Sequence, residues 1–268
     1  MKALVYRGPG DKAIEERPVP TLQAAGDAIV RISRTTICGT DLHILKGDVP
    51  TCEPGRILGH EGVGVVDSVG TAVTNLAPGD PVLISCITAC GRCDYCRRGM
   101  QSHCTTGGWL LGHRIDGTQA EYVRIPHADT SLYKIPEGID EDALVMLSDI
   151  LPTGFECGVL NGKVAPGSTV AIVGAGPIGL AALLTAQFYT PSAIILIDID
   201  DTRLAVARRL GATHVINSGD GGAVARLMDL TGGRGAGTRN EGGGGPPALA
   251  VLHGLAAPRG AGPQIGVD

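Results

Sequence analysis

A strand, a glycine-rich turn and a helix follow one another near the middle of the sequence and constrain the fold more than any other segment. The strand is predicted over Thr169–Val173, the turn reads Gly174-Ala175-Gly176-Pro177-Ile178-Gly179, and an apolar helix is predicted over Pro177–Tyr189. Such alternation of strand and helix with short connections predicts a parallel sheet with right-handed crossovers. Further alternating strands and helices are predicted at Ala193–Asp198, Asp201–Leu210, Thr213–Ile216 and Gly221–Leu230.

The glycine spacing between this strand and helix predicts a dinucleotide site. Gly174 permits a tight turn, and Gly176 lets a pyrophosphate approach the backbone at the start of the helix. Gly179 allows the helix to pack closely on the strand. Pro177 and Ile178 complete the turn and are candidate cofactor-binding residues with the three glycines.

An acidic residue at the end of the next strand indicates which dinucleotide is bound. Asp198 lies 19 residues after Gly179, where a carboxylate binds the adenosine ribose hydroxyls and repels a 2′-phosphate. We therefore predict NAD rather than NADP. Arg203 follows as a further cofactor-binding candidate, although its position favours a helix surface.

Four cysteines lie close together in the pattern Cys90-x2-Cys93-x2-Cys96-x7-Cys104. Four thiolates on one short loop can close a tetrahedron around Zn²⁺ with no open position, which defines a structural site. An iron–sulfur cluster and four unrelated buried thiols are the alternatives. Three further cysteines lack such spacing and are interpreted as small buried hydrophobic residues: Cys52, Cys86 and Cys157.

The first part of the chain has a different rhythm, with short runs of Val, Ile, Thr and Gly broken by turns. This spacing predicts a compact antiparallel barrel. The strands are predicted at Ala28–Ile32, Gly62–Val69, Pro81–Ser85 and Gln119–Ile125.

Composition narrows the classes of function. The 268 residues are 43% hydrophobic, which excludes disorder for most of the chain, and the net charge of −5 argues against nucleic acid or an anionic membrane as partner. No uncharged apolar run reaches the length of a membrane span, and Met1–Arg7 lacks an apolar signal core. We therefore expect a cytoplasmic protein whose cysteines stay reduced.

Two short segments complete a pattern that resembles a known family. Cys38 lies in Ile37–His43, and the later segment reads Gly59-His60-Glu61-x2-Gly64-x5-Gly70-x2-Val73. With the cysteine-rich loop, these segments resemble the zinc-dependent medium-chain alcohol dehydrogenases, in the bacterial branch that acts on small primary and secondary alcohols. The resemblance implies an α/β plus β fold. Residues 1–150 would form a GroES-like antiparallel β-barrel catalytic domain, and residues 151–268 an incomplete doubly wound (Rossmann) domain.

The resemblance also implies a second zinc site with an open position. Cys38, His60 and Asp149 would be the catalytic zinc ligands, and Glu61 would ligate the metal in the resting state. Three protein ligands leave the fourth position for water or substrate, as catalytic zinc requires. The expected metal content is two zinc ions per chain.

Three residues near this site receive roles from the same resemblance. Thr40 and His43 would pass the alcohol proton to water by way of the cofactor ribose. Trp109 falls where related secondary-alcohol enzymes place an aromatic ring against the substrate. A plain core tryptophan is the alternative reading of that position.

The expected activity is reversible hydride transfer between a small alcohol and NAD, giving an aldehyde or ketone. A member specialised for polyols or aldehydes is one alternative, and a non-catalytic zinc- and nucleotide-binding remnant is another. The family's full-length chains are expected to form dimers or tetramers, which is doubtful for this chain.

The last residues keep the family's spacing but not its residue types. Arg239, Asn240, Gly242 and Gly243 occupy positions where a buried strand needs apolar side chains. We therefore expect no regular strand after Gly235 and an incomplete sheet. We interpret this tail as accumulated base changes or a poor gene read ended by a premature stop, so that the chain is expected to be poorly soluble or nearly inactive.

Overall fold

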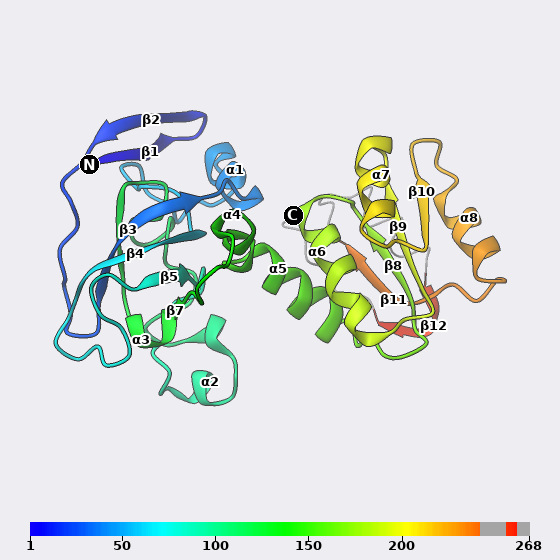
Figure 1. Ribbon diagram of the computed structural model, residues 1–268. Coiled ribbons are helices and arrows are strands. Elements are labelled where there is room, and N and C mark those ends of the chain that lie inside the picture. The colour runs from blue at the N-terminus through cyan, green and yellow to red at the C-terminus, as the bar shows by residue number, and fades with distance from the viewer. Residues whose placement is uncertain (242–255, 262–268) are drawn as a thin grey trace. The chain divides into compact units, whose positions relative to one another are not determined.

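A computed structural model describes residues 1–241 and 256–261, which divide into two compact units (Figure 1). The first unit is Met1–Asp149, and the second begins at Ile150. The division lies one residue before the boundary proposed from the sequence.

The first unit is built on antiparallel strands, as predicted. A hairpin of β1 (Lys2–Gly8) and β2 (Asp11–Glu16) accompanies a five-stranded sheet in the order β6-β3-β4-β5-β7. The sheet strands are β3 (Ala28–Thr35), β4 (Gly62–Val69), β5 (Pro81–Ile84), β6 (Tyr122–Ile125) and β7 (Leu132–Lys134). Short helices lie between them: α1 (Gly39–Lys46), α2 (Asp94–Arg97), η1 (Gln101–His103), α3 (Ala128–Ser131), α4 (Glu141–Leu144) and η2 (Val145–Leu147).

Alternating apolar residues of these strands form the core of the first unit. Val30, Val82 and Ile125 are fully buried in one cluster with Leu111. Because successive strand side chains point to opposite faces, every second residue reaches this core. This core packs one face of the sheet. Cys38 follows the end of β3 and His60 precedes the start of β4, so these candidate ligands lie where strands end or begin.

The second unit contains a parallel sheet in the order β10-β9-β8-β11-β12. Numbered along the chain, this is the order 3-2-1-4-5 of a doubly wound dinucleotide-binding fold. The strands are β8 (Thr169–Val173), β9 (Ala193–Asp198), β10 (His214–Asn217), β11 (Ala236–Glu241) and β12 (Ala256–Ala261). The helices are α5 (Ile150–Thr153), η3 (Gly154–Leu160), α6 (Pro177–Ala186), η4 (Gln187–Tyr189), α7 (Asp201–Arg209) and α8 (Ala223–Leu230).

Helices cover both faces of this sheet, which explains why its strands are almost continuously apolar. On one face, Val170 and Ile172 pack with residues of α6 and α7. On the other face, Ala171 and Val173 pack with residues of α8. Every helix and strand predicted between residues 169 and 230 is present, with ends shifted by no more than a few residues.

The prediction that no strand follows Gly235 is wrong. β11 lies between β8 and β12, and Arg239, Asn240 and Glu241 pair with Ala171, Ile172 and Val173 of β8. Backbone hydrogen bonds make this ladder, so the polar side chains that argued against a strand do not prevent it. Gly242 and Gly243 lie outside the described residues.

Within the part of the chain that is described, no individual helix is both long and apolar enough to cross a bilayer. One bent pair of segments, Glu141–Leu147 and Ile150–Leu160, meets the length and composition requirement only when the two are counted together.

Candidate functional site

Three segments far apart in the sequence bring a thiol, an imidazole and a carboxylate together in the first unit. Cys38 precedes α1, His60 lies just before β4, and Asp149 follows η2. The ligand atoms of the three residues all lie within 4.8 Å of one another. His60 Nε2 is 3.1 Å from Asp149 Oδ2, and Cys38 Sγ is 3.9 Å from the same oxygen.

The donor set fits zinc. Sulfur, nitrogen and oxygen donors on a tetrahedral Zn²⁺ are separated by roughly 3–4 Å, which is the spacing found here. Burial alone would lower the pKa of His60, but Asp149, Cys38 and Asp41 outweigh it and raise the pKa to about 10. The surroundings of His60 therefore stabilise positive charge, and a bound cation would satisfy the same groups that favour the proton.

Asp41 holds the Cys38 segment in place and lies beside His60, and the sequence analysis missed this role. Its Oδ2 accepts hydrogen bonds from the backbone N–H of Cys38 and from Gln119 Nε2, both at 2.9 Å. Its Oδ1 lies 3.8 Å from His60 Nδ1, the ring nitrogen that faces away from Asp149. At this distance the carboxylate acts on His60 through its charge rather than through a hydrogen bond, and it favours positive charge on the ring. The spacing Cys38-x-x-Asp41 at a helix start was the available signal.

Glu61 is buried beside this group but is not one of the three residues whose ligand atoms converge. Its carboxylate accepts a hydrogen bond from Thr36 Oγ1. We therefore keep as a proposal that the Glu61 carboxylate binds the zinc in the resting state.

Thr40 and His43 lie one turn apart on α1, the helix that Cys38 precedes. Thr40 Oγ1 is 3.8 Å from Cys38 Sγ, and His43 Nδ1 is 2.9 Å from Asp48 Oδ2. Residues three apart on a helix face the same side.

Trp109 lies against the same histidine. Its ring is edge-on to His60 at a centroid distance of 6.5 Å and stacks on His113 at 4.2 Å. His113 is held in turn by Thr51 Oγ1, 2.7 Å from its Nε2. Trp109 also packs on the cluster around Ile44 and Leu58, so it is part of a core and a neighbour of the site.

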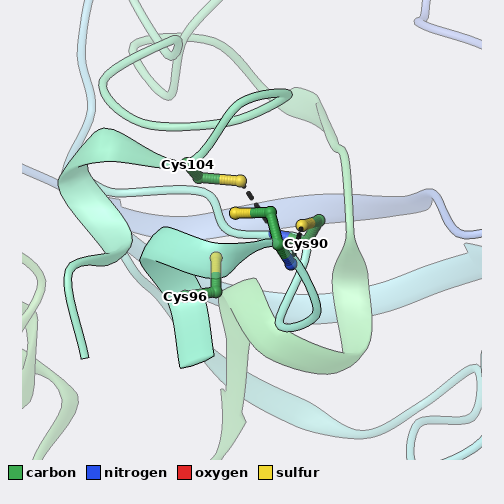
Figure 2. Close-up of side chains that lie close together, drawn as sticks. Cys90, Cys96 and Cys104 are labelled. Atoms are coloured by element: carbon green, nitrogen blue, oxygen red, sulfur yellow. Dashed lines mark hydrogen bonds between the residues drawn. The ribbon is translucent and has the colours of Figure 1, made fainter. Parts of the chain in front are cut away.

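The cysteine-rich loop brings its four thiols together as well. All four sulfur atoms lie within 4.8 Å of one another, and Figure 2 shows Cys90, Cys96 and Cys104 turned toward a common centre. The backbone N–H groups of Cys90 and Cys93 donate to the sulfurs of Cys104 and Cys90. Backbone hydrogen bonds lower the pKa of Cys93 to about 6, which favours the thiolate that a metal needs.

Of the three cysteines interpreted as plain hydrophobic residues, Cys86 has more specific surroundings. Burial raises the pKa of its thiol, and the neighbouring Asp149 carboxylate raises it further. Cys52 is buried in the core beside Tyr6, as interpreted. Cys157 is only half-buried in η3.

In the second unit, the glycines of the turn have distinct conformational roles. Gly174 has a φ of +97°, which favours glycine. A Cβ on Gly179 would lie 1.8 Å from the carbonyl oxygen of Gly174, so only glycine fits there. A Cβ on Gly176 would meet no atom within 4 Å. Gly176 caps α6, and Pro177 and Ile178 are its first two residues.

Asp198 lies at this turn although it ends the next strand. Its Oδ2 accepts the N–H of Ala175 at 2.6 Å, and its Oδ1 accepts the N–H of Asp200 at 2.9 Å. The turn lies where β8 meets β11, the position at which the strand order reverses and where such folds bind their ligands. Arg203 is an exposed residue of α7, so a contact with the cofactor stays a proposal.

Comparison with known proteins identifies the class. Residues 24–137 match the alcohol dehydrogenase GroES-like domain, and residues 177–267 match the zinc-binding dehydrogenase family. A medium-chain reductase/dehydrogenase of an Acremonium species is 38% identical, over 99% of this chain and 93% of that protein. Zinc-type alcohol dehydrogenase B of Aspergillus flavus is 39% identical, over 100% of this chain but only 64% of that protein.

A solved structure gives the same answer for the fold. Zinc-dependent alcohol dehydrogenase 2 from Streptococcus pneumonia, in its apo form, is 52% identical with a TM-score of 0.95. The match covers 100% of this chain and 76% of that one. The chain belongs to the zinc-dependent medium-chain alcohol dehydrogenase family of oxidoreductases.

Proposed function

We propose that this chain catalyses the reversible oxidation of a small alcohol to an aldehyde or ketone with NAD as hydride acceptor. The observation that carries the proposal is the convergence of Cys38, His60 and Asp149, which gives three different zinc donors and leaves a fourth position open. Bound zinc would supply Lewis acidity to the substrate oxygen, and bound NAD would accept the hydride.

The chain's own residues hold the metal and move a proton. Cys38, His60 and Asp149 would bind zinc, and Asp41 holds the backbone of Cys38 through a hydrogen bond to its N–H. Thr40, whose Oγ1 lies 3.8 Å from Cys38 Sγ, would accept the alcohol proton as it gives up its own. His43 is the next acceptor along α1, and Asp48 orients its ring. Trp109 would form a wall of the substrate pocket beside His60.

The cofactor preference is proposed from Asp198. Its carboxylate lies at the glycine turn, where it would bind ribose hydroxyls and repel a 2′-phosphate. We predict that Asp198→Ala weakens NAD binding at least about tenfold, or about 1.4 kcal/mol, with much less effect on NADP. Titration of both cofactors into the parent and the variant measures this. Tighter binding of NADP than of NAD by the parent chain contradicts the assignment.

An activity assay with direct metal analysis tests the proposed reaction. The purified chain, loaded with zinc, should form NADH with members of a panel of primary and secondary alcohols, and this result would overturn the expectation from the tail that the chain is nearly inactive. Cys38→Ser should abolish this activity and remove one zinc, whereas Cys52→Ser, a change to a buried thiol outside both metal groups, should leave the zinc content unchanged. A chain that binds zinc and NAD yet oxidises no alcohol would support the binding-only alternative instead.

The cysteines bear on the compartment in which the protein works. All eight cysteines are free thiols, which persist in a reducing compartment, so we propose a cytoplasmic protein. Dimers or tetramers are expected for the family but doubtful for this chain, and size-exclusion chromatography with light scattering measures its assembly state.

A further inference from the structure

Ser148, the residue before Asp149, makes an unusual pair of contacts. Its hydroxyl accepts a hydrogen bond from the N–H of Gly62 at 3.0 Å and donates one to the C=O of the same residue at 3.2 Å. The side chain is buried, with 3% of its surface exposed. One hydroxyl thus satisfies both backbone groups of one residue, where water has little access.

These contacts join two segments that carry proposed zinc ligands. Gly62 is the first residue of β4 and follows His60 by two positions, whereas Ser148 immediately precedes Asp149. The backbone oxygen of Ser148 also accepts the N–H of Cys86, just after β5. Ser148 therefore fixes the residue-149 backbone relative to the ends of two neighbouring strands.

The position of Asp149 in the chain explains why such a tie is needed. Asp149 lies in the break between η2 and α5, so neither helix includes it. Its Oδ2 nevertheless lies 3.1 Å from His60 Nε2 across 89 residues of sequence. A ligand outside regular structure depends on its neighbours for its distance to the other ligands.

We propose that Ser148 is a positioning residue for the zinc site, which sets the distance between Asp149 and His60 through its two hydrogen bonds to Gly62. The proposal rests on the zinc site of the proposed function. Loss of the hydroxyl leaves the ligand atoms of Asp149 and His60 in the chain, but the distance between them is then less tightly restrained. We expect Ser148→Ala to release one zinc about tenfold to a hundredfold faster, the range found when groups behind metal ligands are removed.

The test follows the release of zinc from the loaded protein to a chromogenic chelator. The time course of zinc release should have one kinetic phase for each zinc. The phase that is absent from Cys38→Ser belongs to the zinc held by Cys38, His60 and Asp149. Release of the zinc of the cysteine-rich loop is an internal control. With Co²⁺ in place of zinc, the visible absorption spectrum reports the ligand geometry directly. Ser148→Thr, which keeps the hydroxyl, should retain the parent release rate and spectrum.

Ser33→Ala is the matched control. Ser33 Oγ lies 3.2 Å from the C=O of Val63, the next residue of β4, and 2.8 Å from Glu141 Oε2, so this change also removes a serine hydroxyl beside β4 but none next to a proposed zinc ligand. A Ser148→Ala release rate and spectrum equal to the parent's would overturn the proposal, as would equal acceleration in Ser33→Ala. If Ser148→Ala does not fold, Ser148→Cys, with similar size and weaker hydrogen bonds, is judged by the same criteria. If Asp149→Asn releases zinc no faster than the parent, the zinc site itself is wrong and the inference fails with it.

Discussion

Single side chains around Trp109 show how burial changes the chemistry of a residue. His113 stacks on Trp109 and has 9% of its surface exposed. Burial is the main cause that lowers the pKa of His113 below its ordinary value of 6.5, and the nearby charges of Arg114 and Arg56 lower it further. A neutral ring is therefore favoured in the folded protein, and this neutral ring stacks on the indole.

A pH dependence follows from the lowered pKa of His113. Well above pH 6.5, by at least about one pH unit, the residue is neutral in the folded and unfolded chain and contributes no pH dependence. As the pH falls below 6.5, the unfolded chain binds a proton there before the folded protein does, so the free energy of unfolding decreases. His113→Phe should reduce this decrease, measured by urea unfolding followed through Trp109, the chain's single tryptophan. The exposed His214→Gln is the control, and an equal effect of both changes would contradict the assignment.

At the scale of the element, two glycines of the turn between β8 and α6 have different roles, one in folding and one in cofactor binding. Gly179 is required by packing, because a Cβ would overlap the carbonyl of Gly174. Gly176 has a φ of −76° and open space around it, so packing does not require a glycine there. Its role in the motif is the close approach of the cofactor.

We therefore predict opposite results for two alanine substitutions. Gly179→Ala should lower the free energy of unfolding by about 1–3 kcal/mol, the usual cost of overpacking. Gly176→Ala should leave unfolding unchanged and weaken NAD binding by about tenfold or more. Chemical denaturation and NAD titration of both variants check this. Equal stability loss in the two variants would contradict the division of roles.

β11 contains a buried polar residue that a central strand does not normally include. Asn240 is 1% exposed, and neither atom of its side-chain amide has a hydrogen-bond partner among the described residues. Thr238, two residues earlier on the same face, is also buried, but its hydroxyl donates to the C=O of Gly162 at 2.9 Å. An unsatisfied buried amide destabilises the fold, whereas a satisfied hydroxyl does not.

Two substitutions in β11 should consequently change the free energy of unfolding in opposite directions. Asn240→Val should raise the free energy of unfolding by about 1–3 kcal/mol, because it removes a buried amide that has no hydrogen-bond partner among residues 1–241 and 256–261. Thr238→Val should lower it by about 1 kcal/mol, because it leaves the carbonyl of Gly162 without its donor. Denaturant unfolding measures both values. A destabilised Asn240→Val variant would mean that the amide is satisfied in solution.

At the scale of the whole molecule, the two metal groups have different relations to the fold. The four cysteines lie on one loop, and the hydrophobic cluster there consists of these cysteines and Ala89, so a bound metal would supply stability that this small cluster does not. Cys38, His60 and Asp149 come from segments already held by the sheet, by Asp41 and by Ser148. Loss of zinc from the cysteine-rich loop should therefore lower the stability of the fold. Loss of zinc from Cys38, His60 and Asp149 should instead lower the catalytic activity.

We predict that the parent chain holds two zinc ions and that single ligand changes separate them. Cys93→Ser should lose one zinc and lower the free energy of unfolding by about 3–5 kcal/mol, as expected for a lost structural metal. Cys38→Ser should lose the other zinc with a change of less than about 1 kcal/mol. Elemental analysis and denaturant unfolding measure both effects. A parent chain with one zinc that survives Cys38→Ser would contradict the second site.

Much of the fold could be predicted because its signals are local. Alternation of strand and helix, the glycine turn and the short strands of the first unit are set by residues near each other in sequence, and the structure has all of these elements. β11 was missed because its side chains are polar, while its place in the sheet depends on hydrogen bonds to β8, more than sixty residues earlier. Ser148 was missed because its partner, Gly62, lies 86 residues earlier in the sequence. Asp41 has a local signal in its contact with the N–H of Cys38, but its contact with Gln119 joins residues 78 positions apart and leaves no local pattern.

The sequence by itself determined what neighbouring residues decide: four thiols within one short loop, and a glycine turn between a strand and a helix. Chain connectivity keeps such groups close in any fold, so spacing alone identifies them. Only the tertiary structure decided which distant groups meet. It brought Asp149 to His60 and to Cys38 across 89 and 111 residues, and tied Ser148 to Gly62 across 86. Those contacts exist because the packed sheet fixes the ends of its strands, and no local pattern records where those ends meet.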